Sequence, residues 1–263
     1  MKKSINVPSQ NVTVIIQARL GSSRLPGKVL TDIEGKPMLW HIIQRVKQAK
    51  KVDKVIVATT DLKEDEKVVD VAKSCGVDFF QGSEHDVLDR YYQAAKTFGA
   101  TTIVRVTGDC PVVDPVLLDR VVEFFLQGGY DHVSTAYPKA TFPDGLDLWV
   151  FSFSALEKAW KEARLVSERE HVTPYMWSHP ELFNIATFEN SKDLSHMRWT
   201  VDEEKDLRFI KEIYKRLYSP EKVFLMKDII VLLEKEPHLQ EINGTITRDE
   251  GYAKSLQEDE KTN

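Results

Sequence analysis

The sequence predicts an α/β domain in which helices flank a mostly parallel β-sheet. Short apolar runs rich in β-branched residues recur along the first half of the chain, and an amphipathic helical pattern follows each of them. Strands that alternate with helices in this way form parallel sheets. The chain has 263 residues, and a single α/β domain often reaches about 250 residues. We therefore expect one large domain.

Four strand and helix units account for the first half of the chain. The strands are expected over 12–18, 54–59, 77–80 and 102–106, and the helices over 37–49, 63–74, 86–98 and 115–128. Asp114 and Pro115 supply the last helix with an N-cap and with a proline at its first position. Because right-handed crossovers align the carboxyl ends of parallel strands, we expect ligands to bind along that edge of the sheet.

The alternation of strand and helix breaks down after residue 130. Strands are expected over 132–136, 146–151 and 184–188, and helices over 152–163, 168–178, 202–217 and 226–236. We interpret the segment of about 137–190 as a small inserted lobe that serves a substrate or a partner subunit. Most tryptophans, among them Trp149 and Trp177, are interpreted as core or subunit-interface residues. Residues 1–256 would form one domain, and residues 257–263 a polar, frayed tail.

Composition and charge exclude several classes of protein. The chain has 36 Lys and Arg against 41 Asp and Glu, a net charge of −5, and 42% of its residues are hydrophobic. This balance excludes a disordered chain and argues against a nucleic-acid-binding protein, which needs a basic surface. Two cysteines form no disulfide framework, so we expect a reducing, cytoplasmic location. The polar first residues predict no secretory signal, and no apolar stretch is long enough to span a membrane.

A basic loop follows the first predicted strand. Gly21 and Gly27 allow a ligand to approach the backbone closely, and the amides of such a loop form an anion-binding concavity. Arginine forks and a lysine point charge bind phosphate oxygens. The loop is neither a Walker A motif nor a GxGxxG fingerprint. Its sequence is Gln17-Ala18-Arg19-Leu20-Gly21-Ser22-Ser23-Arg24-Leu25-Pro26-Gly27-Lys28.

Two aspartates are candidate magnesium ligands. Asp109 follows directly after the fourth predicted strand, next to Gly108, and Asp202 opens a predicted helix. Asp109 alone is equally consistent with a turn residue, whereas for Asp202 the alternative is a plain N-cap, and the metal role is favoured. Mg²⁺ is usually bound by one or two carboxylates together with phosphate oxygens and waters. The proximity of a phosphate-binding loop favours the metal role for both.

Several segments together resemble a known family. The basic loop, Val57–Asp61, Gly82–Arg90, Val106–Pro111, Phe142–Asp147, Ser167–Tyr175, Arg198–Asp202 and the segment from Asn243 to Tyr252 are similar to those of sugar nucleotidyltransferases with a GT-A-like fold. Within these, the chain resembles the cytidylyltransferases that make CMP-sialic acid and CMP-ketodeoxyoctulosonate, and most of all the branch of spore coat polysaccharide biosynthesis protein F. The resemblance implies a Rossmann-like GT-A nucleotidyltransferase fold for residues 1–256.

The resemblance also implies transfer of CMP from CTP to a sugar oxygen, with release of pyrophosphate and with Mg²⁺ as cofactor. Arg19, Lys28 and Asp109 would be catalytic, and Asp109 and Asp202 would hold the metal. The nucleotide would be bound by the following set: Gln17, Ala18, Arg19, Leu20, Ser22, Ser23, Arg24, Lys28, Asp61, Gly82, Arg90 and Asp109.

The acceptor side is expected around Asp144, Asp147, Arg169 and His171. His171 is a candidate general base, although a lone helical histidine is more often structural and a metal-activated hydroxyl needs no dedicated base. The family resemblance implies a sugar-acid acceptor of the nonulosonate type, used for surface polysaccharide, and a homodimer formed through the lobe at 137–190. That lobe follows neither of the two enzyme types closely, so the acceptor stays open.

Three alternatives remain. A glycosyltransferase of the same fold usually places its metal on an Asp-x-Asp motif, and this chain has none. A non-catalytic nucleotide-binding protein would be indicated by loss of Lys28, Asp109 or Asp202, all of which are present. The third alternative is a nucleotidyltransferase that uses a nucleotide with another base. Only the family resemblance favours cytosine over the other bases.

Overall fold

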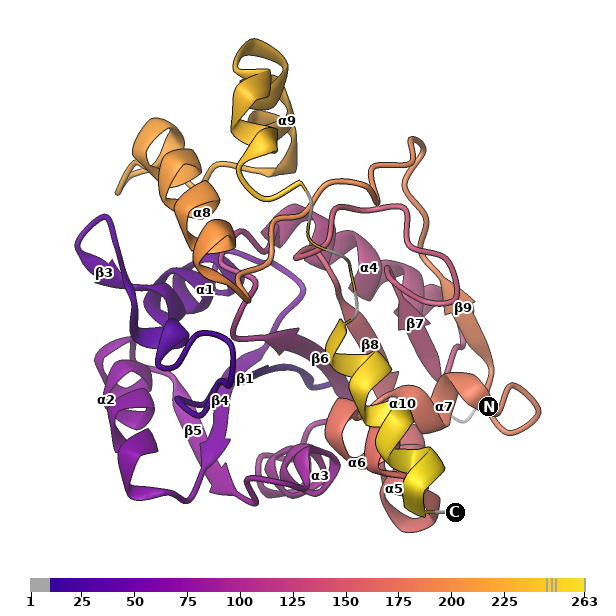
Figure 1. The fold of residues 1–263 in the computed structure, drawn as a ribbon. Helices are drawn as coiled ribbons and strands as arrows, with labels where there is room; N and C mark the ends of the chain where they lie inside the picture. The colour runs from indigo at the N-terminus through magenta and orange to yellow at the C-terminus, as the bar shows by residue number, and fades with distance from the viewer. Residues whose placement is uncertain (1–9, 245, 247, 249, 263) are drawn as a thin grey trace, which may run out of the picture.

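The computed structural model of the protein describes residues 10–244, 246, 248 and 250–262. Its centre is a seven-stranded sheet with the order β5-β4-β1-β6-β8-β7-β9 (Figure 1). The four strands predicted in the first half run parallel, as expected. These strands are β1 (Val12–Gln17), β4 (Lys54–Thr60), β5 (Asp78–Gly82) and β6 (Thr102–Thr107).

The second half completes the sheet in a different way. Strand β8 (Trp149–Ser152) lies between β6 and β7 (His132–Ser134) and runs antiparallel to both. Strand β9 (Ile185–Thr187) pairs with β7 in parallel. The sheet is therefore mostly parallel, which confirms the predicted fold class. Because β8 starts beside the middle of β6, the lobe that precedes it covers the same sheet edge at which β1 and β6 end.

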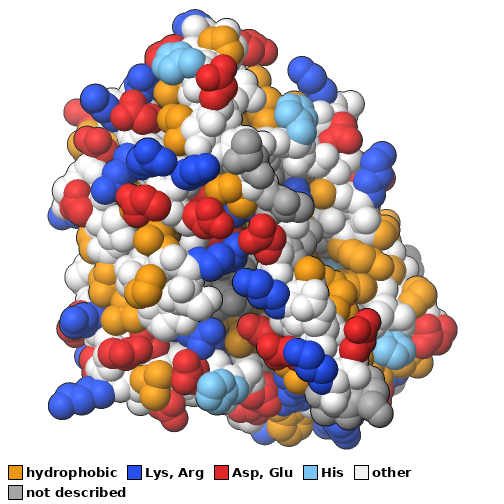
Figure 2. All heavy atoms as spheres, viewed as in Figure 1, with side chains coloured by type: hydrophobic (Ala, Val, Ile, Leu, Met, Phe, Trp, Pro, Cys, Tyr) orange, Lys and Arg blue, Asp and Glu red, His pale blue; other side chains and the backbone are white. Residues whose placement is uncertain are grey.

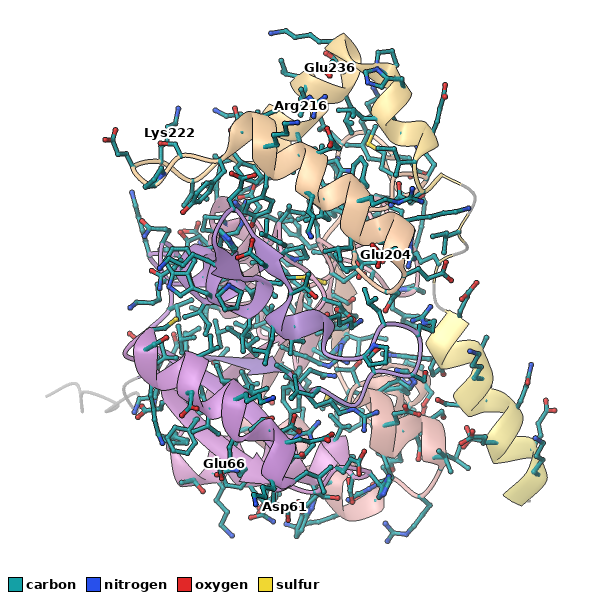
Figure 3. The ribbon with its side chains drawn as sticks, turned by 60° about the vertical axis from the view of Figure 1, so that its left-hand side comes forward. Asp61, Glu66, Glu204, Arg216, Lys222 and Glu236 are labelled. Carbon is teal, nitrogen blue, oxygen red and sulfur yellow. The ribbon has the colours of Figure 1, made fainter. Side chains whose placement is uncertain are left out.

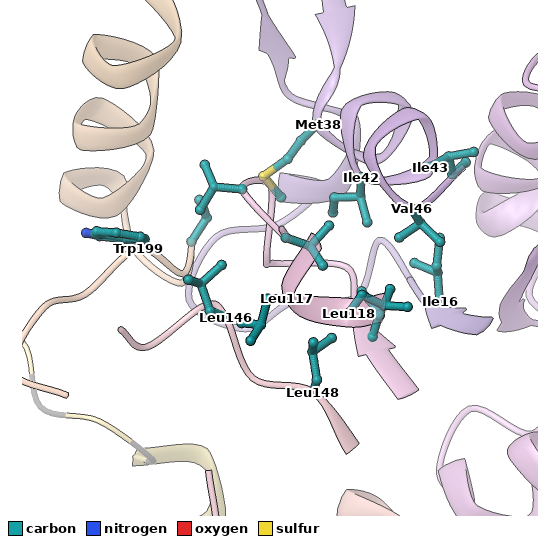
Figure 4. Packing of buried hydrophobic residues seen from close by; sticks show 14 of the residues in the cluster. Ile16, Met38, Ile42, Ile43, Val46, Leu117, Leu118, Leu146, Leu148 and Trp199 are labelled. Carbon is teal, nitrogen blue, oxygen red and sulfur yellow. The ribbon is translucent and has the colours of Figure 1, made fainter. Parts of the chain in front are cut away.

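Both faces of β1 are covered by helices, which explains why its sequence is a continuous apolar run. Val14 and Ile16 pack with α1 (Met38–Val46), α2 (Glu66–Ser74) and α4 (Pro115–Gly128). Figure 4 shows Ile16 facing Ile42, Val46 and Leu118. Ile15 points to the opposite face, where it packs with α3 (Val87–Thr97) and α5 (Phe153–Glu162). This packing fixes the carboxyl end of β1, from which the basic loop leaves.

The other elements surround this core. A small hairpin, β2 (Asp32–Ile33) and β3 (Lys36–Pro37), precedes α1. The later helices are α6 (Val166–His171), α7 (Pro174–Ser178), α8 (Glu204–Leu217), α9 (Met226–Lys235) and α10 (Glu250–Thr262). Short 3₁₀ turns cover Lys28–Leu30, Lys63–Asp65 and Pro237–Glu241. None of the helices in the described residues combines the length and the apolar character needed to cross a bilayer.

The structure corrects two predicted helices. The helix expected over 168–178 is broken into α6 and α7, because Val172 has φ = 71° and the amide of Thr173 donates to the carbonyl of His171 (2.8 Å). The helix expected from Asp202 begins at Glu204 instead. Its N-cap residue is Glu203, not Asp202, and the carboxylate of Asp206 in the first turn accepts the amides of Asp202 and Glu203 (3.0 Å each). The carboxylate of Asp202 is therefore available for another role.

The expected frayed tail is also wrong for residues 257–262, because they continue helix α10. This helix lies against α6 (Figure 1). Ser255 and Asp259 are buried at the contact, and Asp259 accepts the amide of Ser167 (3.1 Å). Residue 263 lies outside the described residues. The C-terminal segment thus joins the part of the molecule that the family resemblance assigns to the acceptor.

Candidate functional site

Two adjoining hollows open at the carboxyl ends of β1 and β6. The first, of about 380 Å³, lies over the basic loop and is called the loop hollow; Ala18, Arg19, Ser22, Ser23 and Lys28 line it. The second, of about 300 Å³, is called the aromatic hollow; Tyr137, Trp149, Trp177 and Tyr252 line it. In Figure 2, basic and acidic side chains surround a hollow near the middle of the face. Residues that line both hollows are Gln17, Arg24, Arg105, Thr107, Asp109, His171, Asp202 and Gly251.

Lys28, Asp109 and Asp202 meet where the two hollows join. The ammonium nitrogen of Lys28 lies 3.1 Å from Asp109 Oδ2 and 2.9 Å from Asp202 Oδ1, and it donates to the carbonyl of Val201 (2.8 Å). The amide of Val201 in turn donates to the carbonyl of Asp109 (2.8 Å). This backbone contact explains why two aspartates that are far apart in the sequence converge, as predicted.

The electrostatics of this cluster keep Lys28 and Asp109 charged. Burial works against the charge of Lys28, but Asp109 and Asp202 outweigh it and raise the pKa of the ammonium group. Burial likewise works against the charge of Asp109, yet Lys28 and the hydroxyl of Thr107 lower the pKa of this carboxyl to about 2. Lys28 and Asp109 are therefore both charged at neutral pH, and the two groups form an ion pair.

The arginines of the basic loop are paired with acids as well. Arg24 contacts Asp202 (2.9 Å) and Glu250 (3.2 Å), and Arg19 contacts Glu84 (2.9 Å). These are surface or half-buried pairs, which contribute little to stability. An incoming polyanion can replace the carboxylates at little cost, so the loop remains suited to bind phosphates.

Asp65, which sequence reasoning missed, anchors the loop. This buried carboxylate accepts the amide of Leu20 through Oδ1 (2.8 Å) and the hydroxyl of Thr60 through Oδ2. Leu20 itself does not line either hollow; it packs on the core. The predicted contact of Leu20 with the nucleotide is therefore wrong. Leu20 has a structural role instead, because its amide links the loop through Asp65 to Thr60 at the end of β4.

Replacing Asp65 by alanine should lower the free energy of unfolding by about 2–4 kcal/mol, because the amide of Leu20 and the hydroxyl of Thr60 would lose their acceptor. Urea unfolding measures this loss. Asp61→Ala is the matched control, since Asp61 is exposed and should change stability by less than about 0.5 kcal/mol. Equal stability of the two variants would show that Asp65 does not hold the loop.

Three predicted residues do not face the site. Asp61 is exposed and lines neither hollow; Figure 3 places it at the lower edge of the view. Gly82 lines neither hollow, but a Cβ there would lie 3.4 Å from Cγ of Arg90. Arg169 contacts Asp86 and donates to the carbonyl of Trp160 (2.8 Å), so its guanidinium points away from the hollows. We withdraw these three residues as ligand contacts.

Arg90 does reach the loop hollow. It is 1% exposed, and it donates to the carbonyl of Ser83 (2.9 Å). Its Nε is buried and has no hydrogen-bond partner among the described residues. Burial lowers the pKa of this guanidinium. A buried, incompletely bonded arginine beside a hollow is consistent with the predicted nucleotide contact.

Asp144 and Asp147 lie on the wall of the aromatic hollow, as predicted, but both are held by arginines. Arg198 contacts Asp144 (2.8 Å) and also Asp202 (3.0 Å), and Arg248 contacts Asp147. Gly145 between them has φ = 101°, and a Cβ there would lie 2.6 Å from the amide of Thr200. The turn therefore requires glycine, and it fixes the wall against the strand-like segment that leads to Asp202.

His171 lines both hollows, where α6 meets α10. Its Nε2 lies 3.0 Å from Oγ of Ser255, and that hydroxyl donates to Glu170 (2.6 Å). Burial and the positive charge of Arg105 lower the pKa of His171 to about 4. The imidazole is therefore neutral at pH 7 and is a weak base. Its contacts favour the structural interpretation, in which it holds α10 over the site.

Sequence reasoning missed Arg105 and the residues of α10 that line the hollows. Arg105 is the only charged residue in the otherwise apolar and threonine-containing strand β6, and this isolated charge was the sequence signal that could have identified it as a site residue. Trp149 and Trp177 line the aromatic hollow and are not simply core or interface residues. The lining residues of α10 are Glu250, Gly251, Tyr252, Lys254, Ser255 and Glu258.

Comparison with known proteins decides the family. A family model described as cytidylyltransferase matches residues 13–236. The chain belongs to the cytidylyltransferase family. This cytidylyltransferase is 41% identical to an uncharacterized protein of Methanocaldococcus jannaschii, over 90% of its own length and 96% of that protein. It is 31% identical to spore coat polysaccharide biosynthesis protein SpsF of Bacillus subtilis, over 86% and 95% of the two chains.

Solved structures agree with this assignment. A cytidylyltransferase from Leptospira borgpetersenii superposes with a TM-score of 0.85 at 37% identity, over 91% of this cytidylyltransferase and all of that chain. A CMP-2-keto-3-deoxy-manno-octonic acid synthetase solved with CTP gives a TM-score of 0.62 at 19% identity, over 80% and 100%. The second likeness shows a shared nucleotidyltransferase fold.

Proposed function

We propose that this cytidylyltransferase transfers CMP from CTP to a hydroxyl group of a sugar acid of the nonulosonate type, for surface polysaccharide. The observation that carries the proposal is the position of Lys28, whose ammonium group lies between Asp109 and Asp202 where the two hollows join. A phosphate to be cleaved at this point would have a cationic loop on one side and a second, aromatic space on the other. The similarity to spore coat polysaccharide biosynthesis protein SpsF supports a polysaccharide precursor as the product.

The residues of the loop hollow take the nucleotide. The backbone of the basic loop, Ser22 and Ser23 surround the phosphate tail, and Arg19, Arg24 and Lys28 supply positive charge. When the phosphates enter, Arg24 and Lys28 exchange part of their contacts with Asp202 for phosphate oxygens. Gln17, Ala18 and Arg90 line the same hollow and are assigned to the nucleoside. Stabilising the charge that develops on pyrophosphate is the main catalytic demand.

The acids at the junction fit a magnesium ion. Asp109 Oδ2 and Asp202 Oδ1 lie 3.1 and 2.9 Å from the same Lys28 nitrogen, so both carboxylates converge on one position beside that ammonium group. Within the described residues no group of three or more His, Cys, Asp or Glu side chains could hold a metal by itself. Two carboxylates completed by phosphate oxygens and waters are the usual ligands of Mg²⁺. When bound, the ion would supply charge stabilisation to the phosphates and would acidify the attacking hydroxyl.

The reaction requires one bond to form and one to break. The acceptor oxygen forms a bond to the α-phosphorus, and the bond between the α-phosphorus and its bridging oxygen to the β-phosphate breaks. Pyrophosphate leaves with that electron pair, and the hydroxyl proton passes to solvent. Arg24 and Lys28 hold the leaving pyrophosphate, while Asp109 and Asp202 lie beside the α-phosphate. His171 is not needed as a base.

We also propose a homodimer and a cytoplasmic location. Leu165, Val166 and Leu182 are exposed apolar side chains on or beside the lobe at 137–190, which favours a subunit contact there. Light scattering that gives the mass of one chain would contradict the dimer.

Both cysteines are free and buried, which agrees with the proposed location in a reducing compartment.

A thermal-shift screen of nucleoside triphosphates with Mg²⁺ tests the nucleotide assignment. At 100 times its Kd a ligand stabilises the native state by about 2.7 kcal/mol, which raises the Tm of a chain of this size by roughly 5–10 °C. CTP should give this shift, and ATP, GTP and UTP a much smaller one. A larger shift with UTP would indicate another base. A shift only with nucleotide sugars would favour a glycosyltransferase, and no shift at all would favour a protein without this activity.

A further inference from the structure

Arg105 occupies an unusual position for a charged residue. It lies in β6, four residues before Asp109, and it is 5% exposed. Its guanidinium lies over the ring of Trp149, 4.4 Å from the centroid, and its Nε donates to Oε1 of Gln17 (3.1 Å). The side chain lines both hollows. A long cationic side chain is thus held over Trp149 at the place where the two hollows adjoin.

No carboxylate of the described residues forms an ion pair with Arg105, whereas the other arginines around the aromatic hollow have acidic partners. Arg198 contacts three aspartates, Arg248 contacts Asp147, and Arg24 contacts two acids. The Nη atoms of Arg105 make no hydrogen bond within the described part of the chain. They are not fully buried either, because they are absent from the set of buried polar atoms that have no hydrogen-bond partner. They therefore face the hollow. Burying a guanidinium without a counter-charge is costly, so this arrangement calls for an anionic ligand.

The position of Arg105 favours the acceptor over the nucleotide as that ligand. Arg105 lines the aromatic hollow together with His171 of α6. Trp149 beneath it belongs to the aromatic hollow and not to the loop hollow. The phosphate tail already has three cations of the basic loop.

The rest of the aromatic hollow suits a sugar ring. Tyr137 and Trp177 stack with their centroids 3.8 Å apart, and Tyr252 meets Trp177 edge to face at 5.7 Å. Such a wall packs against the apolar C–H face of a pyranose. The planar guanidinium fork matches a carboxylate in bidentate geometry, and the aromatic platform below restrains it.

We propose that Arg105, seated on Trp149, binds the carboxylate of the acceptor and selects sugar acids over neutral and phosphorylated sugars. This inference rests on the proposed function and names the chemical group that its second substrate must carry. Arg105 is thereby a specificity-determining residue, and Trp149 is a positioning residue that acts through it.

Kinetics with matched acceptors test the inference. Pyrophosphate release from CTP and Mg²⁺ is measured with 3-deoxy-manno-octulosonate and N-acetylneuraminate, with the methyl ester of each, and with mannose and glucose 1-phosphate. The wild type should prefer the better acid over its ester by about 10- to 100-fold in kcat/KM, as expected for charged hydrogen bonds. Arg105→Gln should lose this preference through a higher KM for the acid, and its KM for CTP should stay within about twofold of the wild-type value.

Two variants serve as controls. Arg105→Lys keeps the charge but loses the fork, so it should restore only part of the preference. Arg208→Gln removes an exposed arginine of α8 that lines neither hollow, and it should behave as the wild type. The acid-to-ester ratio of kcat/KM in the wild type tests carboxylate recognition without any substitution. The inference can therefore still be tested if the Arg105→Gln variant does not fold.

The possible failures are distinguishable. If the wild type transfers CMP equally to acid and ester, or only to a neutral or phosphorylated sugar, the role of Arg105 is wrong while cytidylyl transfer stands. An unchanged acid-to-ester ratio in a folded Arg105→Gln variant would have the same meaning. If none of these compounds supports pyrophosphate release, the proposed function and the inference fall together.

Discussion

Lys28→Ala should abolish measurable cytidylyl transfer, with a loss of at least about 10³-fold in kcat, while the fold stays intact. The ammonium group is the cation that separates Asp109 from Asp202. Without it, two carboxylates would face the incoming triphosphate and repel it. Loss of one preorganised donor to a developing oxyanion typically costs about 10²–10³-fold, and the repulsion adds to this. The fold should survive because Lys28 begins a short 3₁₀ turn of three residues and because water from the hollow can solvate the two acids.

The measurement is pyrophosphate release from CTP with the best acceptor, next to a circular dichroism spectrum of each variant. Lys205→Ala removes an exposed lysine on α8 and should leave the rate unchanged. Lys28→Arg keeps the charge and should retain part of the activity. A Lys28→Ala variant that releases pyrophosphate at the wild-type rate would remove Lys28 from the catalytic site.

Asp109→Asn should reduce the rate by about 10²-fold and raise the Mg²⁺ concentration needed for half-maximal activity. The substitution keeps the shape of the side chain but removes its charge, and a neutral amide is a poorer ligand for a hard cation. The contacts that hold the segment in place use the backbone carbonyl of Asp109, which accepts from Val201 and Thr200, so local structure should persist.

A Mg²⁺ titration at saturating CTP measures this effect. Asp61→Asn, at an exposed position outside both hollows, is the control and should give the wild-type curve. An Asp109→Asn variant with an unshifted Mg²⁺ titration would exclude this carboxylate from a metal site. A shifted titration with a normal rate at high Mg²⁺ would confine its role to affinity for the ion.

The parallel half of the fold was predictable because its strands are buried on both faces. Val14, Ile15 and Ile16 each contact a covered face, so the apolar run is continuous in the sequence. The convergence of the basic loop with Asp109 followed from the same topology, since β1 and β6 are neighbours that end at one edge. Asp202 was predicted from its segment, although the helix it was thought to open begins later.

The cover of the site was not predictable in the same way. Helix α10 is largely polar, and its contact with α6 depends on polar bonds such as Ser255 to Glu170 and Asp259 to Ser167. No apolar periodicity marks such a helix. Arg169 was misassigned because residues two apart on a helix do not share a face, so His171 and Arg169 cannot both point into one hollow.

Arg105 was missed because its burial depends on a partner far along the chain. Trp149 stands opposite Arg105 only because β8 enters the sheet antiparallel, between β6 and β7. The sequence pattern of a short strand gives neither its direction nor its neighbours. The chemistry of the acceptor side therefore had to come from the three-dimensional arrangement.

A crystal structure of the protein with CTP and Mg²⁺ tests the central claim most directly. We expect the triphosphate in the loop hollow, with phosphate oxygens within hydrogen-bond distance of Lys28 and Arg24, and with the α-phosphate beside Asp109 and Asp202. The aromatic hollow should stay open to an acceptor. A nucleotide bound elsewhere, or one whose α-phosphate lies away from both aspartates, would contradict the account.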